Sequence, residues 1–302
     1  MSYSAKAILD SLSPDGVRLT TMEVSFPRIV LAEFNTHRMF SRNSASSRAI
    51  PVEKMIARVL EDPFVPIYWG KNQKGMQAAE ELGEREREQA AGTWLSARDE
   101  AVRSVRLLAV DLDVHKQIAN RLLEPWLWHT CIVTATEWDN FFALRRHPAA
   151  QPEIKRAADL LFEARESSTP KALGHEEWHA PYIDLAESAA EYDVALDRLS
   201  DSAVFAHVER WCKVSVGRCA RVSYLTHDGV RDPDKDVALA DGLLKNGHMS
   251  PFEHVARPMS GRDIAFRRPR NISEAFLGNF RGWVQYRKGI TGEEDFSLVG
   301  SS

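Results

Sequence analysis

The chain has 302 residues, of which 44% are hydrophobic, and this is enough for a packed core in one large domain or two small ones. The net charge of −4 disfavours a general nucleic-acid binder, no apolar run of about 18 residues predicts a membrane span, and the N-terminal residues lack the layout of a signal peptide. Three scattered cysteines are too few for a disulfide scaffold or a zinc site, so we expect a cytoplasmic protein without a metal centre.

In the first part of the chain, residue patterns predict a strand followed by two helices. Residues 17–26 are rich in β-branched and apolar side chains, which favours a strand. Ser25 and Pro27 suit the start of a short helix over residues 28–37, and a basic, serine-rich loop follows it. Pro51 opens a helix over residues 52–61, whose apolar side chains recur at helical spacing.

The rest of the chain is mostly helical by the same criteria. Residues 74–122 are rich in Ala, Glu, Leu and Arg and predict two or three helices. Further helices are expected over residues 137–147, 151–165 and 237–248, the last capped by Gly247, and residues 171–185 read as a loop. We therefore predict a helix-dominated α+β fold in a single domain, residues 1–302.

Residues 33–48 hold more anion-binding groups than a surface turn needs. Arginine forks, serine hydroxyls and backbone N–H groups together form a cradle for phosphate. A capped helix end followed by a polar surface loop explains the same residue types equally well, so composition alone leaves both interpretations open.

A second cluster lies between Arg121 and Arg146. Its aromatic residues, Trp126, Trp128, Phe141 and Phe142 among them, are most simply core. Arg121 and Arg145 lie on otherwise apolar helices, where an arginine either extends into solvent or faces an anion.

A third cluster, NGHMSPFEH, spans residues 246–254. His248, Glu253 and His254 raise the question of a metal site, but their spacing matches neither zinc-protease helix motif. A hydrogen-bonded His–Glu pair is the simpler interpretation.

Taken together, these clusters resemble the flavin-dependent thymidylate synthases. The family signature is R-H-R, seven residues, a serine and, two residues on, an arginine; here Thr36-His37-Arg38 is followed by Ser46 and Arg48. The family segments G-H-x-[ST]-P-F-E-H and A-R-V-S-[FY] are intact at residues 247–254 and 220–224. R-x-x-x-P leading to N-F-x-x-L-R matches Arg121, Pro125, Asn140, Phe141, Leu144 and Arg145, and a short A-Q-x-E-I echo follows at residues 150–154.

The order of these segments departs from the family. In typical members the segments A-R-V-S-[FY] and G-H-x-[ST]-P-F-E-H precede the R-H-R motif, whereas here, at residues 220–224 and 247–254, they follow it by nearly two hundred residues. The chain resembles a circular permutation of the family fold, which is tolerated when the termini lie close together at the surface. We expect residues 219–254 to lie beside residues 33–48.

The resemblance implies an antiparallel sheet with a helical part and a reductive methylation of dUMP to dTMP. FAD would be the cofactor, NADPH and methylenetetrahydrofolate the co-substrates, and the protein a homo-oligomer, with the family's tetramer and shared sites as the implied arrangement. It implies no protein nucleophile, and no nucleic-acid or membrane partner is expected. The protein would bind and orient, while the flavin carries the redox chemistry.

Residue by residue, the resemblance implies the following roles. Arg145 would be catalytic and contact the nucleotide, favouring the ionised pyrimidine N3. The cofactor side would be formed by Thr36, His37, Arg38, Asn140, Ser223, His248 and Ser250. The remaining substrate contacts would be Glu33, Ser44, Ser46, Ser47, Arg48 and Arg121.

Four positions depart from the family pattern. Its first motif arginine is Thr36, a glutamine is Glu33, a glutamate is Ser44 and a tyrosine is Ala49. Losing a cation and moving a carboxylate changes how the nucleotide is held. A related enzyme that methylates or hydroxymethylates another pyrimidine nucleotide, such as dCMP, therefore stays open, as does a non-catalytic nucleotide-binding relative.

Overall fold

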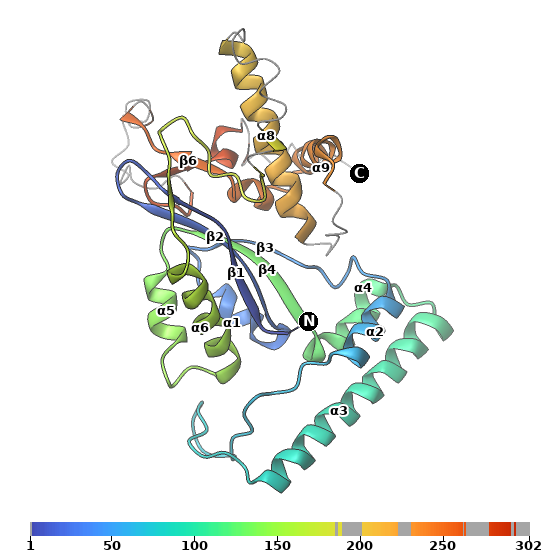
Figure 1. Ribbon diagram of the computed structural model, residues 1–302. Coiled ribbons are helices and arrows are strands. Elements are labelled where there is room, and N and C mark those ends of the chain that lie inside the picture. The colour runs from blue at the N-terminus through green and yellow to red at the C-terminus, as the bar shows by residue number, and fades with distance from the viewer. Residues whose placement is uncertain are drawn as a thin grey trace.

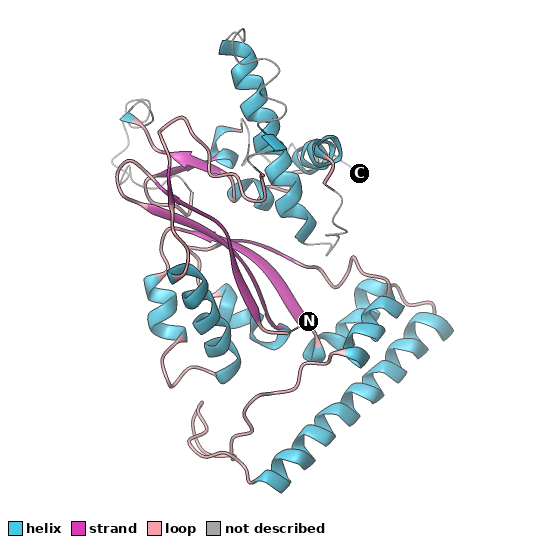
Figure 2. Cartoon of the chain, viewed as in Figure 1, coloured by secondary structure: helices cyan, strands magenta, loops and turns pink. Residues whose placement is uncertain are grey.

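The computed structural model describes residues 2–184, 187–188, 201–222, 231–261, 263, 278–290 and 293. A central sheet separates helices on its two faces, and a group of helices extends from one end of it (Figures 1 and 2). This confirms the predicted α+β class. In the part of the chain that the structure describes, no helix is long and apolar enough to span a membrane.

The main sheet has five strands in the order β3-β4-β2-β1-β5. The pairs β1–β2, β2–β4 and β4–β3 are antiparallel, as predicted, and only the two-residue β5 pairs in parallel with β1. The strands are β1 (Ser4–Leu12), β2 (Arg18–Pro27), β3 (Ser41–Ser44), β4 (Trp128–Ala135) and β5 (Lys171–Ala172).

Two helices cover one face of the sheet. Alternate residues of β2, including Met22 and Val24, point toward α5 (Asp139–Arg145) and α6 (Pro152–Glu166) and form the largest apolar cluster with them. Proline at the first position of α6 suits the helix start, since its missing N–H would have no partner there.

The group of helices at the end of the sheet consists of α2 (Val52–Glu61), α3 (Glu84–Arg106), the π-helix η2 (Leu107–Asp111), α4 (Lys116–Ala119) and the 3-10 helix η3 (Asn120–Trp126) (Figure 1). They share a second apolar cluster. The prediction of helix from residue 74 was wrong at its start, because residues 74–83 form a loop with a bridge between Gly70 and Glu81.

The opposite face of the sheet is covered by the later part of the chain. Helix α8 (Asp201–Arg221) packs its Cys219 against Ile132 of β4, and α9 (Pro233–Lys245) packs against α8. The backbones of α8 and α9 approach so closely that a Cβ at Gly217 would meet the carbonyl oxygen of Asp236 at 2.3 Å. The remaining elements here are η6 (Ser250–Glu253), β6 (Ala256–Pro258), β7 (Trp283–Gln285) and η7 (Tyr286–Gly289).

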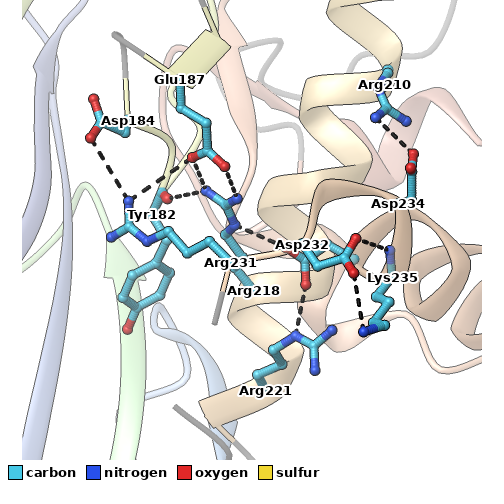
Figure 3. Close-up of polar contacts among 11 residues, drawn as sticks. Tyr182, Asp184, Glu187, Arg210, Arg218, Arg221, Arg231, Asp232, Asp234 and Lys235 are labelled. Carbon is cyan, nitrogen blue, oxygen red and sulfur yellow. Dashed lines mark hydrogen bonds and ion pairs between the residues drawn. The ribbon is translucent and has the colours of Figure 1, made fainter. Parts of the chain in front are cut away.

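A buried ion network fixes the C-terminal end of α8 (Figure 3). Arg218 donates to Asp236 of α9 at 3.0 Å and to both carboxylate oxygens of Glu187 at 2.6 and 2.8 Å, and Arg221 donates to the other oxygen of Asp236 at 2.7 Å. Asp236 is 2% exposed, so the paired arginines offset the cost of burying its charge. Ala220 lies between the two arginines in the sequence, so the network also fixes the position of Ala220.

The structure also contains elements that the sequence patterns missed. Residues 28–35 are helical as predicted, as η1 (Arg28–Val30) and α1 (Leu31–Asn35), but residues 41–44 are the edge strand β3 and not part of a loop. Strands β1 and β4 were not predicted. In the sheet, β4 lies between β2 and β3, so residues 41–44 form the edge strand next to it.

Candidate functional site

A cavity of about 470 Å³ lies where four separate parts of the chain meet. Its lining comes from the strand and turn after residue 42, from the start of α4, and from the segments around Ala220 and Ser250. The lining residues are Asn43, Ser44, Ser46, Arg48, Ala49, His115, Gln117, Ala220, Leu243, His248, Ser250 and Pro251.

Asn43 joins two of these parts directly. Its Nδ2 donates to the carbonyl of Cys219 at 3.0 Å, and its Oδ1 accepts from the hydroxyl of Ser250 at 3.4 Å. The predicted juxtaposition of residues 219–254 with residues 33–48 is thereby confirmed. A permuted order of segments still builds one cavity because the contacts are spatial.

The polar groups around the cavity suit an anion. Arg48 is exposed, and within the described part of the chain its guanidinium has no hydrogen bond or ion pair. Ser44 and Ser46 also line the cavity, and the Ser44 hydroxyl donates to Cys131 Sγ at 3.4 Å. An unpaired arginine beside hydroxyl groups in a concave site is the usual chemistry of phosphate recognition.

The local fold of the NGHMSPFEH segment explains how His248 and Ser250 reach the cavity. Gly247 has φ +69°, which ends α9 and reverses the chain, as predicted for this cap. Pro251 then opens the short turn η6. The reversal leaves His248 and Ser250 exposed beside the cavity and turns Phe252 into the core.

The expected His–Glu pair in this segment is wrong. Glu253 accepts from Arg287, and His254 is fully buried with its Nδ1 2.8 Å from Thr134 Oγ1. The sequence could not separate these cases, because both partners come from distant elements.

His254 belongs to a chain of buried hydrogen bonds that crosses the sheet. Thr134 Oγ1 lies 2.7 Å from Thr21 Oγ1, which lies 2.7 Å from His179 Nε2, and His179 Nδ1 lies 2.8 Å from Ser11 Oγ. Burial lowers the pKa of His179 and of His254 to about 3, so both rings are neutral at pH 7.

A second group of predicted site residues gathers around Arg145, at the end of α5. Its Nε donates to His37 Nε2 at 2.9 Å, and its Nη2 donates to Thr36 Oγ1 at 3.1 Å and to the carbonyl of Glu33 at 3.4 Å. Burial first, and then the charges of Arg145 and Arg42, lower the pKa of His37 to about 4. His37 is therefore a neutral acceptor that, together with Thr36, holds the guanidinium in place.

Thr36 occupies the position of the family's first motif arginine, and the structure gives this departure a physical consequence. A threonine hydroxyl donates to the Glu33 carbonyl at 2.6 Å and accepts from Arg145. A cation at this position would repel Arg145. The carboxylate of Glu33 is only part-exposed, and its Oε2 is buried without a hydrogen bond among the described residues.

The remaining predicted residues divide between the two groups or lie elsewhere. Ser47 is 5% exposed and donates to Glu124 at 3.0 Å, and Arg121 also pairs with Glu124 at 2.6 Å; neither lines the cavity. Arg38 and Asn140 are exposed. Ser223 lies outside the described residues. On this single chain the predicted set thus forms two neighbourhoods, one around Arg48 and one around Arg145.

Sequence reasoning missed His115 and Gln117 in the cavity wall. Both lie in the stretch that was read only as helix, and neither belongs to a motif. His115 Nδ1 accepts from the backbone N–H of Gln117 at 3.3 Å, a bond local to the start of α4. No sequence signal identified either residue.

Comparison with known proteins settles the family. The family model described as thymidylate synthase complementing protein matches residues 17–171, slightly more than half of the chain. The chain belongs to this family. The resemblance read from the motifs is thereby confirmed, and with it the prediction of an enzyme of the methyltransferase class. The matched residues contain the motif segments 33–48 and 121–154 but not residues 219–254, which come before these segments in typical members.

Two solved structures illustrate the likeness to known proteins. The UMP/dUMP methylase PolB from Streptomyces cacaoi, bound with 5-Br UMP, has 17% identity and a TM-score of 0.45 over 55% of this chain and 89% of its own. The flavin-dependent thymidylate synthase ThyX from Helicobacter pylori, complexed with FAD and dUMP, has 18% identity and a TM-score of 0.34 over 49% of this chain and 67% of its own. None of the curated proteins matches the chain.

Proposed function

We propose that the protein is a flavin-dependent thymidylate synthase that methylates C5 of dUMP with methylenetetrahydrofolate and NADPH. The observation that carries the proposal is the cavity in which Arg48, Ser46 and Ser250 converge from segments some two hundred residues apart, in a chain of this family. The volume of about 470 Å³ suits a nucleoside monophosphate.

Arg48, Ser44 and Ser46 would bind the phosphate. A guanidinium offers two parallel N–H donors to a phosphate, and the hydroxyls can turn to suit the remaining oxygens. The resemblance also includes Ser47 and Arg121 among the substrate contacts. Both are bonded to Glu124, so they would support the phosphate site without touching the phosphate.

Arg145 would stabilise the negative charge that builds on the pyrimidine as C5 attacks the activated methylene. Such a group is effective when it is fixed before the reaction, because no reorganisation is then needed. Bonds to His37, Thr36 and the Glu33 carbonyl provide that fixation and leave Nη1 without a hydrogen bond in the described part of the chain. Neutral His37 stabilises Arg145 without adding a second charge.

The residues present fit FAD in their chemistry. Arg38, Asn140, His248 and Ser250 are exposed donors that could hold its diphosphate and ring edges, and bound FAD supplies the hydride that completes the methyl group. These four residues are divided between the neighbourhoods of Arg48 and Arg145. We propose that a second subunit of a homotetramer completes each site, so that the two neighbourhoods of different chains face one cofactor.

A cysteine nucleophile is not required in this proposal, and the state of the cysteines supports that. All three are buried. Burial raises the pKa of Cys131 to about 11 and raises those of Cys212 and Cys219 still further above the ordinary thiol value. Thiols in such settings are protonated at neutral pH and unreactive.

The test is a paired assay with dUMP and dCMP, each supplied with FAD, methylenetetrahydrofolate and NADPH. We expect dTMP from dUMP and no product from dCMP. Conversion of dCMP, or a hydroxymethyl product, would replace the proposal with the related enzyme that the change at Thr36 leaves open. Folded protein that takes up neither FAD nor nucleotide would contradict enzymatic function in this site.

A further inference from the structure

The turn that carries Arg48, residues 47–50, is hydrogen-bonded to two side chains from α4 and the first residue of η3. Asn120 Nδ2 donates to the carbonyl of Ser47 at 2.9 Å and to the carbonyl of Ile50 at 3.0 Å. Lys116 Nζ donates to the carbonyl of Ala49 at 3.2 Å. Three side-chain hydrogen bonds therefore fix the backbone on both sides of Arg48, although the two segments are about seventy residues apart.

The orientation of the Asn120 amide is dictated by its surroundings. The residue is 1% exposed, and its Nδ2 lies between two carbonyl oxygens. A flipped amide would place Oδ1 against both carbonyls and lose both bonds. Oδ1 itself is buried without a hydrogen bond among the described residues, so the site bears the cost of one unsatisfied acceptor to keep these two donors in place.

We propose that Asn120 is a positioning residue for nucleotide binding: it holds the 47–50 turn so that Arg48 faces the cavity. The inference rests on the proposed function and extends it to a residue that touches no ligand. Arg48 is exposed, and among the described residues its guanidinium has no hydrogen bond or ion pair, so the direction of its side chain depends on the backbone of the turn. Among the described residues, the turn has two other hydrogen bonds: the backbone bond from Ala49 N to Ser46 O at 3.2 Å, and the bond from the Ser47 hydroxyl to Glu124 at 3.0 Å. The bonds from Asn120 and Lys116 are the ones that hold the carbonyls on either side of Arg48.

Asn120 also lies within a packed group of helices. The test must therefore distinguish a role in positioning Arg48 from a role in the stability of these helices. Asn120 lies between Ala119 and Leu123, which are both in the apolar cluster of α2, α3 and η3. A variant that only loosens this cluster lowers thermal stability without a specific effect on Arg48. Coupling between Asn120 and Arg48 is the property that a structural role does not produce.

The experiment is a double-mutant cycle on dUMP affinity with the FAD-loaded, full-length protein. Asn120→Ala should weaken dUMP binding by about tenfold when Arg48 is present, the coupling expected of residues in one network. In the Arg48→Ala background the same change should alter the dissociation constant by less than about twofold. The KM for dUMP should rise while kcat at saturation stays near wild type, because Arg145 lies in the other neighbourhood.

Val59→Ala is the matched control, since Val59 is fully buried in the same apolar cluster but, among the described residues, makes no hydrogen bond to the 47–50 turn. It should lower the melting temperature and leave dUMP affinity unchanged. If Asn120→Ala does not fold, Asn120→Ser, which keeps one hydroxyl donor, takes its place in the cycle with a smaller expected loss. An Asn120 effect of equal size in both backgrounds, or no effect, would overturn the inference. Wild-type protein that is folded yet fails to bind dUMP would instead contradict the proposed function.

Discussion

Replacing Arg48 with alanine should separate ligand binding from stability. The guanidinium has no partner in the described part of the chain, so the free energy of unfolding should change by no more than about 0.5 kcal/mol. A hydrogen bond to a charged group is worth about 1.5–3 kcal/mol. Loss of the Arg48–phosphate contact should therefore raise the dissociation constant for dUMP by roughly 10- to 150-fold.

Titration calorimetry with dUMP measures this change, and flavin absorbance checks that the cofactor content is unaltered. The adjacent serines provide matched controls. Ser46→Ala should weaken dUMP binding because Ser46 lines the cavity, whereas Ser47→Ala should affect it less because the Ser47 hydroxyl bonds to Glu124. A dissociation constant that is unchanged in Arg48→Ala would refute the assignment of this cavity to the phosphate.

Three further predictions concern catalysis and pH. Arg145→Ala should lower kcat by about 10²–10³, and Arg145→Lys should not restore it, because lysine lacks the planar fork; steady-state kinetics with a near-wild-type lysine variant would contradict this. Alanine at all three cysteines should keep most of the activity, and a folded, flavin-loaded but inactive triple variant would require a cysteine nucleophile. Because His179 and His254 have folded-state pKa values of about 3, below the ordinary histidine value, the unfolded chain binds more protons as the pH falls. Stability should thus be greatest above about pH 6.5 and fall towards pH 3, by up to about 1.4 kcal/mol per pH unit for each histidine. Urea unfolding at pH 7 and pH 5 measures this, and equal stabilities would contradict it.

Two helices with one buried and one exposed face were predictable from the sequence. The helices over residues 52–61 and 152–166 repeat their apolar residues at helical spacing because only one side of each is buried. Strand β4 was missed because nearly all of its residues are buried on both faces of the sheet, which removes the alternation that marks a strand.

The sequence predicted which segments form the candidate site, but not which of their side chains face the cavity. The motifs indicated that residues 33–48 and 219–254 meet, and Asn43 bonds to both Cys219 and Ser250. Which of two neighbouring serines faces the cavity depends on a partner, Glu124, about eighty residues away, and no pattern local to the loop encodes it. The same holds for His254, whose partner is Thr134 and not the adjacent glutamate.

The most direct test of the central claim follows the carbon atom that is transferred. The purified protein is incubated with dUMP, NADPH, FAD and methylenetetrahydrofolate labelled with heavy carbon in its methylene group, and the nucleotide product is analysed by mass spectrometry. The account predicts dTMP that carries the label in its C5 methyl group, formed only when FAD is present. Unlabelled nucleotide, a labelled hydroxymethyl product, or labelled dTMP formed equally well without flavin would contradict it.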